Sequence, residues 1–382
     1  HLGNWPMHLP MLDINTIGAG GGSIAFLTQA GNLQVGPRSA GADPGPACYG
    51  KGGAEPTVTD ANLVLGRIAS QLAGGDLQLH VEQAMEAIES KVARPLGMKL
   101  EQAASGILRI VNNNMMGAIR AVSIERGYDP RGFALVAFGG AGPMHAAYVA
   151  QLLDIPVVLA PRNPGVTSAY GLLVTDFQND YSRTFLQKPP HYDLVAMEKA
   201  YKELEAEGRR WLTEEKVPTE LQAMRRSADL RYAHQGAEVT ADFPSTGSGH
   251  SDGSRVTRES LNKLIQNFHQ RHRQLYNFAL EQLVEMVTLR VAAVGRIHTP
   301  PLPPLPSSLG GPEQAQVDQR PVYFDEMSCF VDTNIYQRER LAAGSAIAGP
   351  AIIQQVDSTV LVPPGWRSQV DAVGNIVIRR RR

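Results

Sequence analysis

The chain has 382 residues, 43% hydrophobic and 19% charged, values that are typical of a globular protein with two or three domains. Its 36 basic and 37 acidic side chains leave a formal charge of -1, which gives no reason to expect nucleic acid or a membrane surface as a partner. Two distant cysteines, no apolar run of about 20 residues and no signal-like start favour a reducing cytoplasm and suggest neither a disulfide framework nor a membrane span.

The first 40 residues predict three short strands joined by tight turns. The strands are expected at residues 11–17, 24–29 and 33–37, and the turn GAGGGS at 18–23 connects the first two. Residues 39–61 are dense in Gly and Pro, and they favour an ordered loop of the kind that often carries function.

Within that loop, residues 45–51 approach the spacing of a phosphate-binding P-loop. Gly52 stands where the P-loop requires Ser or Thr, Pro46 interrupts the loop, and no strand leads into it. A P-loop is therefore rejected, and the chain also lacks a dinucleotide-binding GxGxxG turn after a first parallel strand.

Two amphipathic helices are predicted next, because apolar residues recur at intervals of three or four. The residues on the two apolar faces are Val81, Met85, Ile88 and Val92, then Ala103, Ile107, Val111, Met115 and Ile119. After Gly127 the pattern gives strands at 133–140 and 155–161 and helices at 142–153 and 164–173. The order β-β-β-α-β-α-β-α is that of a ribonuclease H-like half-domain, a unit that actin-type ATPases use twice and that occurs once here.

The composition changes after residue 175. A charged helix near 194–211, a strand-like segment at 228–244, a helix at 261–275 and a strand at 286–297 predict a mixed α+β domain. A proline-rich segment at 299–312 predicts an extended linker. The expected domains are a ribonuclease H-like ATPase half-domain at 1–175, a mixed α+β domain at 176–300, and a linker with a small β-rich module at 301–382.

The first candidate site combines a carboxylate with a glycine-rich turn. The residues are Asp13, followed by Gly18, Gly20, Gly21, Gly22 and Ser23. Backbone N–H groups of such a turn can converge on an anion, and a nearby carboxylate can hold Mg²⁺ or a water. The alternative is a plain flexible hairpin, although hairpin turns usually need fewer glycines.

The second candidate is the turn between the strand at 133–140 and the helix after it, where N–H groups at a helix start could face a nucleotide. Its residues are Gly139, Gly140, Ala141, Gly142 and Pro143. Any tight strand-to-helix turn can also use glycine. Two further features stay open: His269 and His272 could share a metal or a polar face, and Asn112 to Asn114 could make a buried polar contact or face a nucleotide cleft.

Several blocks closely resemble the A-type subunit of the hydantoinase/oxoprolinase family. They are DINTIGAGGGSIA, SAGADPGPACYGKGGAEPTVTDANLVLGR, FGGAGPMHA, RNPGVTSAYGLL and GPAIIQQVDSTVLVPPGW. The resemblance spans nearly the whole chain. It implies an actin and sugar-kinase-like fold in which two ribonuclease H-like halves enclose ATP. Asp13 and residues 18–23 then match the second phosphate loop, and residues 139–143 match the adenosine loop.

The resemblance implies an ATP-binding subunit that uses ATP and Mg²⁺, with Asp13 as the catalytic and metal-binding residue, to open a small cyclic amide by phosphorylating its carbonyl oxygen. Two partners are implied, a B-type subunit and the N-terminal half of the A-type subunit, which this sequence lacks. Where family members commonly have histidine, this chain has Asn15. Alternatives are an acetone/acetophenone-type carboxylase subunit and a non-catalytic actin-like scaffold.

Overall fold

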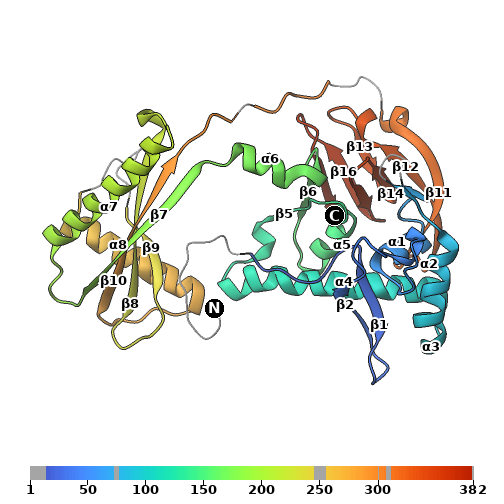
Figure 1. The fold of residues 1–382 in the computed structure, drawn as a ribbon, viewed down its shortest axis with the longest axis horizontal. Helices are drawn as coiled ribbons and strands as arrows, with labels where there is room; N and C mark the ends of the chain where they lie inside the picture. The colour runs from blue at the N-terminus through green and yellow to red at the C-terminus, as the bar shows by residue number, and fades with distance from the viewer. Residues whose placement is uncertain (1–13, 73–76, 245–254, 300, 307–310, 381–382) are drawn as a thin grey trace. The chain divides into compact units, whose positions relative to one another are not determined.

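A computed structural model describes residues 14–72, 77–244, 255–299, 301–306 and 311–380 (Figure 1). The chain divides into two compact units. Unit 1 contains residues 125–128 and the described part of 171–299, and unit 2 contains 14–124, 129–170 and the described part of 301–380. Within these described ranges, no helix has both the length and the apolar character that crossing a membrane requires.

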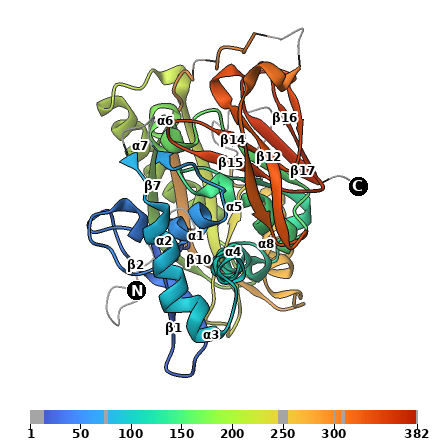
Figure 2. The ribbon, with the colours of Figure 1, turned by 90° about the vertical axis from the view of Figure 1, so that its right-hand side faces the viewer.

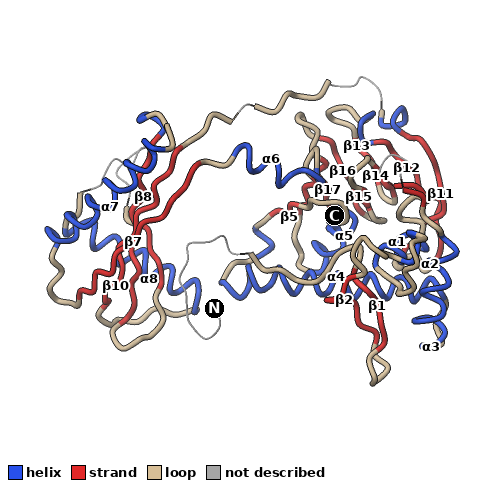
Figure 3. The backbone as a smooth tube through the Cα atoms, in the orientation of Figure 1, coloured by secondary structure: helices blue, strands red, loops and turns tan. Residues whose placement is uncertain are grey.

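Helices and strands are spread over the whole described chain (Figure 3). The helices are α1 Val58–Val64, α2 Val81–Ile88, α3 Arg94–Leu96, α4 Leu100–Val122, α5 Gly142–Leu152, α6 Thr167–Val174, α7 Leu194–Glu214 and α8 Arg258–Tyr276. The strands are β1 Ser23–Leu27, β2 Leu33–Ser39, β3 Gln71–Leu72, β4 Leu77–Gln78, β5 Ala134–Val136, β6 Val157–Ala160, β7 Phe177–Gln187, β8 Gln222–Tyr232, β9 Val239–Asp242, β10 Val284–Gly295, β11 Gln316–Phe324, β12 Cys329–Gln337, β13 Ala346–Ala348, β14 Ala351–Gln354, β15 Thr359–Val362, β16 Trp366–Val370 and β17 Ile376–Arg380.

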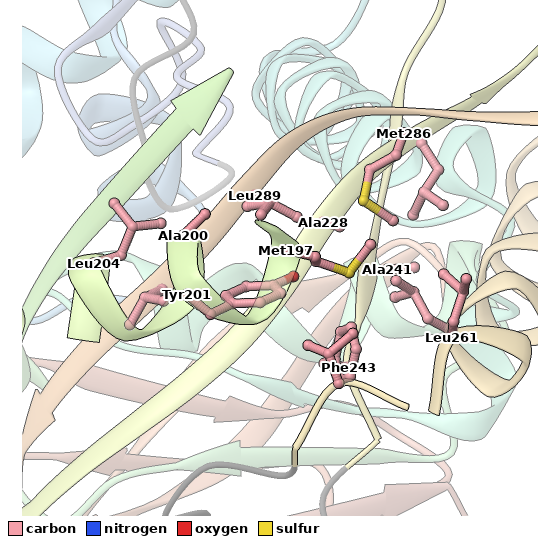
Figure 4. Packing of buried hydrophobic residues seen from close by; sticks show 14 of the residues in the cluster. Met197, Ala200, Tyr201, Leu204, Ala228, Ala241, Phe243, Leu261, Met286 and Leu289 are labelled. Atoms are coloured by element: carbon pink, nitrogen blue, oxygen red, sulfur yellow. The ribbon is translucent and has the colours of Figure 1, made fainter. Parts of the chain in front are cut away.

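Unit 1 is a four-stranded antiparallel sheet of order β7-β10-β8-β9 with α7 and α8 packed in a common core. Figure 4 shows Met197 and Tyr201 of α7 together with Leu261 of α8 in that core. Arg226 on β8 is buried and binds Glu198 and Glu205 of α7, so an ion-pair network adds to the apolar contacts.

Unit 2 contains the remaining sheets. The hairpin β1-β2 packs with α1, α2 and the long helix α4 around one apolar cluster, and Figure 2 views α4 end-on. Two larger sheets have the orders β13-β16-β17-β6-β5 and β11-β12-β14-β15. In the first of them β5 and β6 are parallel, and β17 pairs antiparallel with β6 over residues 157–160.

The mixed α/β class with several sheets agrees with the sequence analysis, and most predicted helices and strands are present. The strand expected at 11–17 is wrong over its described part, because residues 14–17 pair with no described strand and Ile14 is 72% exposed. The sequence analysis also missed α1 and β7, and it did not predict that β17 of the C-terminal segment would pair with β6.

The loop that precedes α1 is held by a buried carboxylate. Asp60 is fully buried, and its two oxygens accept hydrogen bonds from the N–H groups of Ala47, Cys48 and Thr57 and from the hydroxyl of Thr57. Thr57 caps α1 in return through the N–H of Asp60. Because burial and the neighbouring Asp60 charge disfavour the thiolate, the pKa of Cys48 is raised.

Replacement of Asp60 by alanine should lower the free energy of unfolding by about 3 kcal/mol, because four hydrogen bonds to one buried carboxylate are lost. Urea unfolding followed by circular dichroism measures this change. Asp43→Ala, at an exposed residue of the same loop, is the matched control and should change stability by less than about 0.5 kcal/mol. Equal stability of the two variants would contradict the role given to Asp60.

Candidate functional site

The first glycine turn, residues 18–23, is held by hydrogen bonds from Ser23 and Thr59. Ser23 Oγ donates to the carbonyl of Gly18 at 3.2 Å and accepts from the N–H of Gly20 at 2.9 Å. The carbonyl of Gly21 accepts from both the N–H and the hydroxyl of Thr59. The turn is therefore an ordered structure, which disfavours the plain flexible hairpin considered above.

Packing explains some of the glycines in this turn but not all of them. A Cβ at Gly18 would lie 2.6 Å from the backbone of Pro37, and a Cβ at Gly21 would lie 2.8 Å from the hydroxyl oxygen of Thr59. At Gly20 a Cβ would meet nothing within 4 Å. Among the described residues, the N–H groups of Gly21 and Gly22 have no hydrogen-bond partner. Open space and free N–H groups are what an anion-binding turn offers.

A pocket of about 760 Å³ lies next to the start of this turn. Gly18 and Ala19 line it from the turn, β2 lines a second side, and Asn113 and Asn114 line it from α4. Asn114 donates to the carbonyl of Val35 at 3.0 Å and so fixes α4 against β2. Two of the three consecutive asparagines therefore line this pocket.

Asn15 also lines this pocket. Its amide nitrogen lies 3.5 Å from the carbonyl oxygen of Ala118 on α4, at the limit of a hydrogen bond. Asp13, the expected catalytic and metal-binding residue, lies outside the described residues. Its assignment stays a prediction.

The second glycine turn, residues 139–143, connects β5 to α5 and is held by two other loops. The N–H of Gly139 donates to the carbonyl of Pro164 at 2.7 Å, and Ser358 Oγ donates to the carbonyls of Gly139 and Gly140. Gly139 has a φ of +80°, a conformation that favours glycine. Ala141 precedes α5, which begins with Gly142 and Pro143, so N–H groups at the start of this helix belong to the turn.

Three of the distinctive sequence blocks meet at this second turn. Asp357 accepts a hydrogen bond from the N–H of Gly165 at 2.9 Å, where a Cβ would lie 2.3 Å from the carboxylate oxygen. Gln355 donates to the same carboxylate and accepts from Arg338 at 2.8 Å. Arg338 also donates to the carbonyls of residues 160, 161 and 374. Burial lowers the pKa of Arg338 to about 10.

The two glycine turns belong to the same unit, and a buried polar contact joins the helices beside them. Asn112 on α4 accepts from Nδ1 of His145 on α5 at 2.8 Å, and both side chains are buried. This is the buried polar contact that the asparagine run suggested. None of residues 20–23 or 139–143 lines the pocket beside Gly18, so the structure does not bring both turns into one described pocket.

The histidine pair in unit 1 has no third metal ligand among the described residues. His269 Nδ1 lies 2.7 Å from the hydroxyl of Tyr232, and His272 Nδ1 lies 2.8 Å from the carbonyl of Phe278. Burial lowers the pKa of His269. Across the part of the chain that the structure describes, no group of three His, Cys, Asp or Glu residues is arranged to hold a metal ion. His272 is buried against aromatic rings, so the two histidines do not form a simple polar face.

The sequence analysis missed the residues that hold each turn in place. Thr59 and Pro37 position the first turn, and Ser358 and Asp357 position the second from a loop more than 200 residues away along the chain. Residues 357 and 358 lie in the block GPAIIQQVDSTVLVPPGW, so the family resemblance was the available signal. Thr59 also lies in one of these blocks, although its local sequence pattern assigns it no role.

The fold is mixed α/β, and one unit contains two glycine turns that hydrogen bonds hold in place. Turns of this kind can bind an anionic ligand through backbone amides. Residues 2–181 match the hydantoinase/oxoprolinase family and residues 187–379 match the hydantoinase/oxoprolinase C-terminal domain. The chain belongs to the hydantoinase/oxoprolinase family.

Two curated relatives and one solved structure illustrate the relationship. The chain is 40% identical over 368 residues to the caprolactamase subunit alpha of Pseudomonas jessenii, covering 95% of this chain and 52% of that protein. It is 34% identical to the acetophenone carboxylase gamma subunit of Aromatoleum aromaticum, covering 98% and 52%. The crystal structure of an ATP-dependent caprolactamase from Pseudomonas jessenii aligns with a TM-score of 0.89 at 39% identity, covering 98% of this chain and 54% of that one. The chain thus spans about half the length of these relatives.

The two kinds of glycine in the first turn should respond differently to alanine. Gly18→Ala should destabilise the protein by about 2 kcal/mol or more, because its Cβ would overlap the backbone of Pro37. Gly20→Ala has open space around the new methyl group, so its free energy of unfolding should change by about 1 kcal/mol or less. Thermal unfolding of the two variants tests this difference, and the reverse order of stability would refute the assigned geometry.

The protein should lose stability as the pH falls because of His145. Burial, together with the charge of Arg67, lowers the pKa of His145 to about 4, well below the usual 6.5. Between pH 6.5 and 4 the unfolded chain binds a proton that the folded chain does not, so up to about 3 kcal/mol is lost across this window. Unfolding measured at pH 7 and pH 5 should show a smaller decrease for His145→Gln than for the wild type. His80→Gln, at an exposed site, should keep the wild-type decrease.

Proposed function

We propose that this chain is the ATP-binding part of the A-type subunit of a lactam-opening enzyme of the hydantoinase/oxoprolinase type. The single observation that carries the proposal is the hydrogen-bonded first glycine turn, where the N–H groups of Gly21 and Gly22 have no partner among the described residues and Gly20 has open space around it. The similarity of this chain to an ATP-dependent caprolactamase, over 98% of its length, supports the same assignment. In this proposal the actin-like arrangement arises when a second half-domain completes the nucleotide cleft.

In the proposed site, residues 18–23 hold phosphate groups through backbone N–H donors, and residues 139–143 contact the nucleoside. Asp13 would bind Mg²⁺, which usually takes one or two carboxylates and fills its other positions with phosphate oxygens and water. A site of this kind needs no larger cluster of metal ligands. Mg²⁺ would supply neutralisation of the phosphate charge during transfer.

The chemical reason for using ATP is that an amide carbon is a poor electrophile. Transfer of the terminal phosphoryl group to the amide oxygen would convert that oxygen into a better leaving group, with ADP released. Water would then add to the carbon, and breaking of the C–N bond would give an acyl phosphate and a free amine. A second water would hydrolyse the acyl phosphate to a carboxylate and inorganic phosphate. The residues of this chain would contribute positioning and charge stabilisation, which is most of what phosphoryl transfer requires.

The remaining parts of the enzyme are also proposals. The chain spans about half the length of its relatives, which supports a partner segment equivalent to the N-terminal half of the A-type subunit. A B-type subunit would complete the hydrolysis of the phosphorylated intermediate. The small cyclic amide would enter the cleft that these parts form together.

A carboxylase subunit is the second candidate, because the acetophenone carboxylase gamma subunit is 34% identical and is covered to the same extent as the caprolactamase subunit. The two activities differ in the compound that stimulates ATP hydrolysis. Cyclic amides would stimulate a lactam-opening enzyme, and bicarbonate with a ketone would stimulate a carboxylase. ATP binding without stimulation by either would favour a non-catalytic scaffold.

The test is ATP turnover by the complete enzyme that contains this chain, assembled with its N-terminal half and B-type subunit. Release of ADP should rise at least about tenfold when a panel of lactams and hydantoins contains the substrate, and bicarbonate should have no effect. Asp13→Asn should abolish turnover, whereas Asp43→Asn, a matched exposed control, should retain it. Unchanged turnover in Asp13→Asn would remove the catalytic assignment of that residue.

A further inference from the structure

A second pocket of unit 2, formed between α4, α5 and the turn after β11, contains a buried arginine that forms no ion pair with the described residues. The pocket has a volume of about 480 Å³ and includes Arg67, Asn112, Tyr148, Asp325 and Glu326 in its lining. It shares no lining residue with the pocket beside Gly18 and includes none of residues 139–143. It is therefore separate from the turns assigned to ATP.

Arg67 is only 4% exposed, and no hydrogen bond or ion pair from the described residues engages its guanidinium group. The Nε atom is fully buried and unpartnered. The guanidinium group stacks on the ring of Tyr148, and its Cζ atom lies 5.3 Å from the ring centroid. A buried cation without an anion is costly, so this position favours the binding of an anionic group.

A second donor is available beside Arg67. Asn112 uses its side-chain oxygen to accept from His145, which leaves its amide nitrogen as a donor at the pocket wall. A guanidinium group and an amide N–H₂ group together form a suitable binding site for a carboxylate.

The opposite charges of the pocket lie toward its exposed side. Glu326 is exposed and accepts a hydrogen bond from the hydroxyl of Tyr148 at 3.4 Å, while Asp325 is half-buried. Arg109 lies 3.9 Å from Asp325 with 75% of its side chain exposed, so it neutralises that carboxylate only weakly. The lining carries two positive and two negative side chains, with the buried end positive and the exposed end mostly negative.

We propose that this pocket binds a small amino acid as a zwitterion, with its carboxylate on Arg67 and Asn112 and its ammonium group near Asp325 and Glu326. A phosphate ion would satisfy Arg67 but would face two carboxylates, so it fits the charge pattern less well. A volume of 480 Å³ suits a ligand of this size.

The proposal has one link to the lactam-opening activity. Opening a lactam produces a molecule with a carboxylate at one end and an amine at the other, so the pocket would accept the class of compound that the reaction releases. Only this link rests on the proposed function. The proposal that an amino acid binds in this pocket does not depend on the lactam-opening function.

The test is isothermal titration calorimetry of the complete enzyme with glycine, 4-aminobutanoate, 6-aminohexanoate, butanoate, butylamine and inorganic phosphate. At least one of the three amino acids should bind about tenfold or more tightly than butanoate and butylamine, because each charged end forms its own charge-assisted contacts. Absence of binding by all three amino acids, or tighter binding of phosphate, would overturn the proposal.

Variants locate the binding in this pocket. Arg67→Met should weaken amino-acid binding by about 30-fold or more, whereas Arg94→Met, at an exposed position, should not change it. Asp325→Asn combined with Glu326→Gln removes two charges near the surface and should retain the fold. This double variant should weaken binding of the amino acid but not of butanoate.

The outcomes separate the two proposals. Unchanged binding in Arg67→Met, or an equal loss for amino acid and butanoate in the double variant, would refute the pocket assignment. If Arg67→Met fails to fold, the double variant and the comparison with butanoate still test whether the amino acid binds in this pocket. Amino-acid binding without lactam-stimulated ATP turnover would support the pocket assignment and contradict the lactam-opening function. Lactam-stimulated turnover without amino-acid binding would support the function and contradict the pocket assignment.

Discussion

The buried hydrogen bond between Asn112 and His145 is the contact on which the arrangement of unit 2 depends. It fixes α4 against α5, and each of these helices adjoins one of the two glycine turns. The bond also orients both side chains beside Arg67, because Asn112 lines the arginine pocket and the charge of Arg67 acts on His145. A polar bond in an otherwise apolar interface specifies one alignment of the two helices, since any other alignment leaves both groups unsatisfied.

Glycine has two separate uses in this protein, and the structure distinguishes them. At positions such as Gly18 and Gly165, a neighbouring backbone or carboxylate occupies the place where a Cβ would lie, so the residue is required for packing. At Gly20 and Gly139 the space is open, and packing gives no reason for glycine, although Gly139 is required by its positive φ. Under the proposed function, a close approach of the nucleotide to the backbone would account for the openness at Gly20.

Four buried side-chain polar atoms in the described part of unit 2 have no hydrogen-bond partner, and two of them lie close together. Arg67 Nε and His145 Nε2 lack hydrogen bonds within the described residues, and the two side chains are close enough for the arginine charge to lower the histidine pKa. Buried unsatisfied groups reduce stability, so an unsatisfied arginine that lines a pocket is expected where a ligand completes the site. The buried carboxylate of Asp60 differs from these groups, because it accepts four hydrogen bonds from residues of the fold itself.

The sequence by itself determined the local elements and the two glycine turns. The helical period predicted α2 and α4, short apolar runs predicted β5 and β6, and glycine density located residues 18–23 and 139–143. Tertiary structure alone decided what supports those turns, because Thr59, Asp357 and Ser358 reach them across long stretches of chain. It also decided the pairing of β17 with β6, and it left the buried Nε atom of Arg67 without a hydrogen bond among the described residues. Such contacts depend on which residues folding brings together, and a local pattern of residue types does not contain that information.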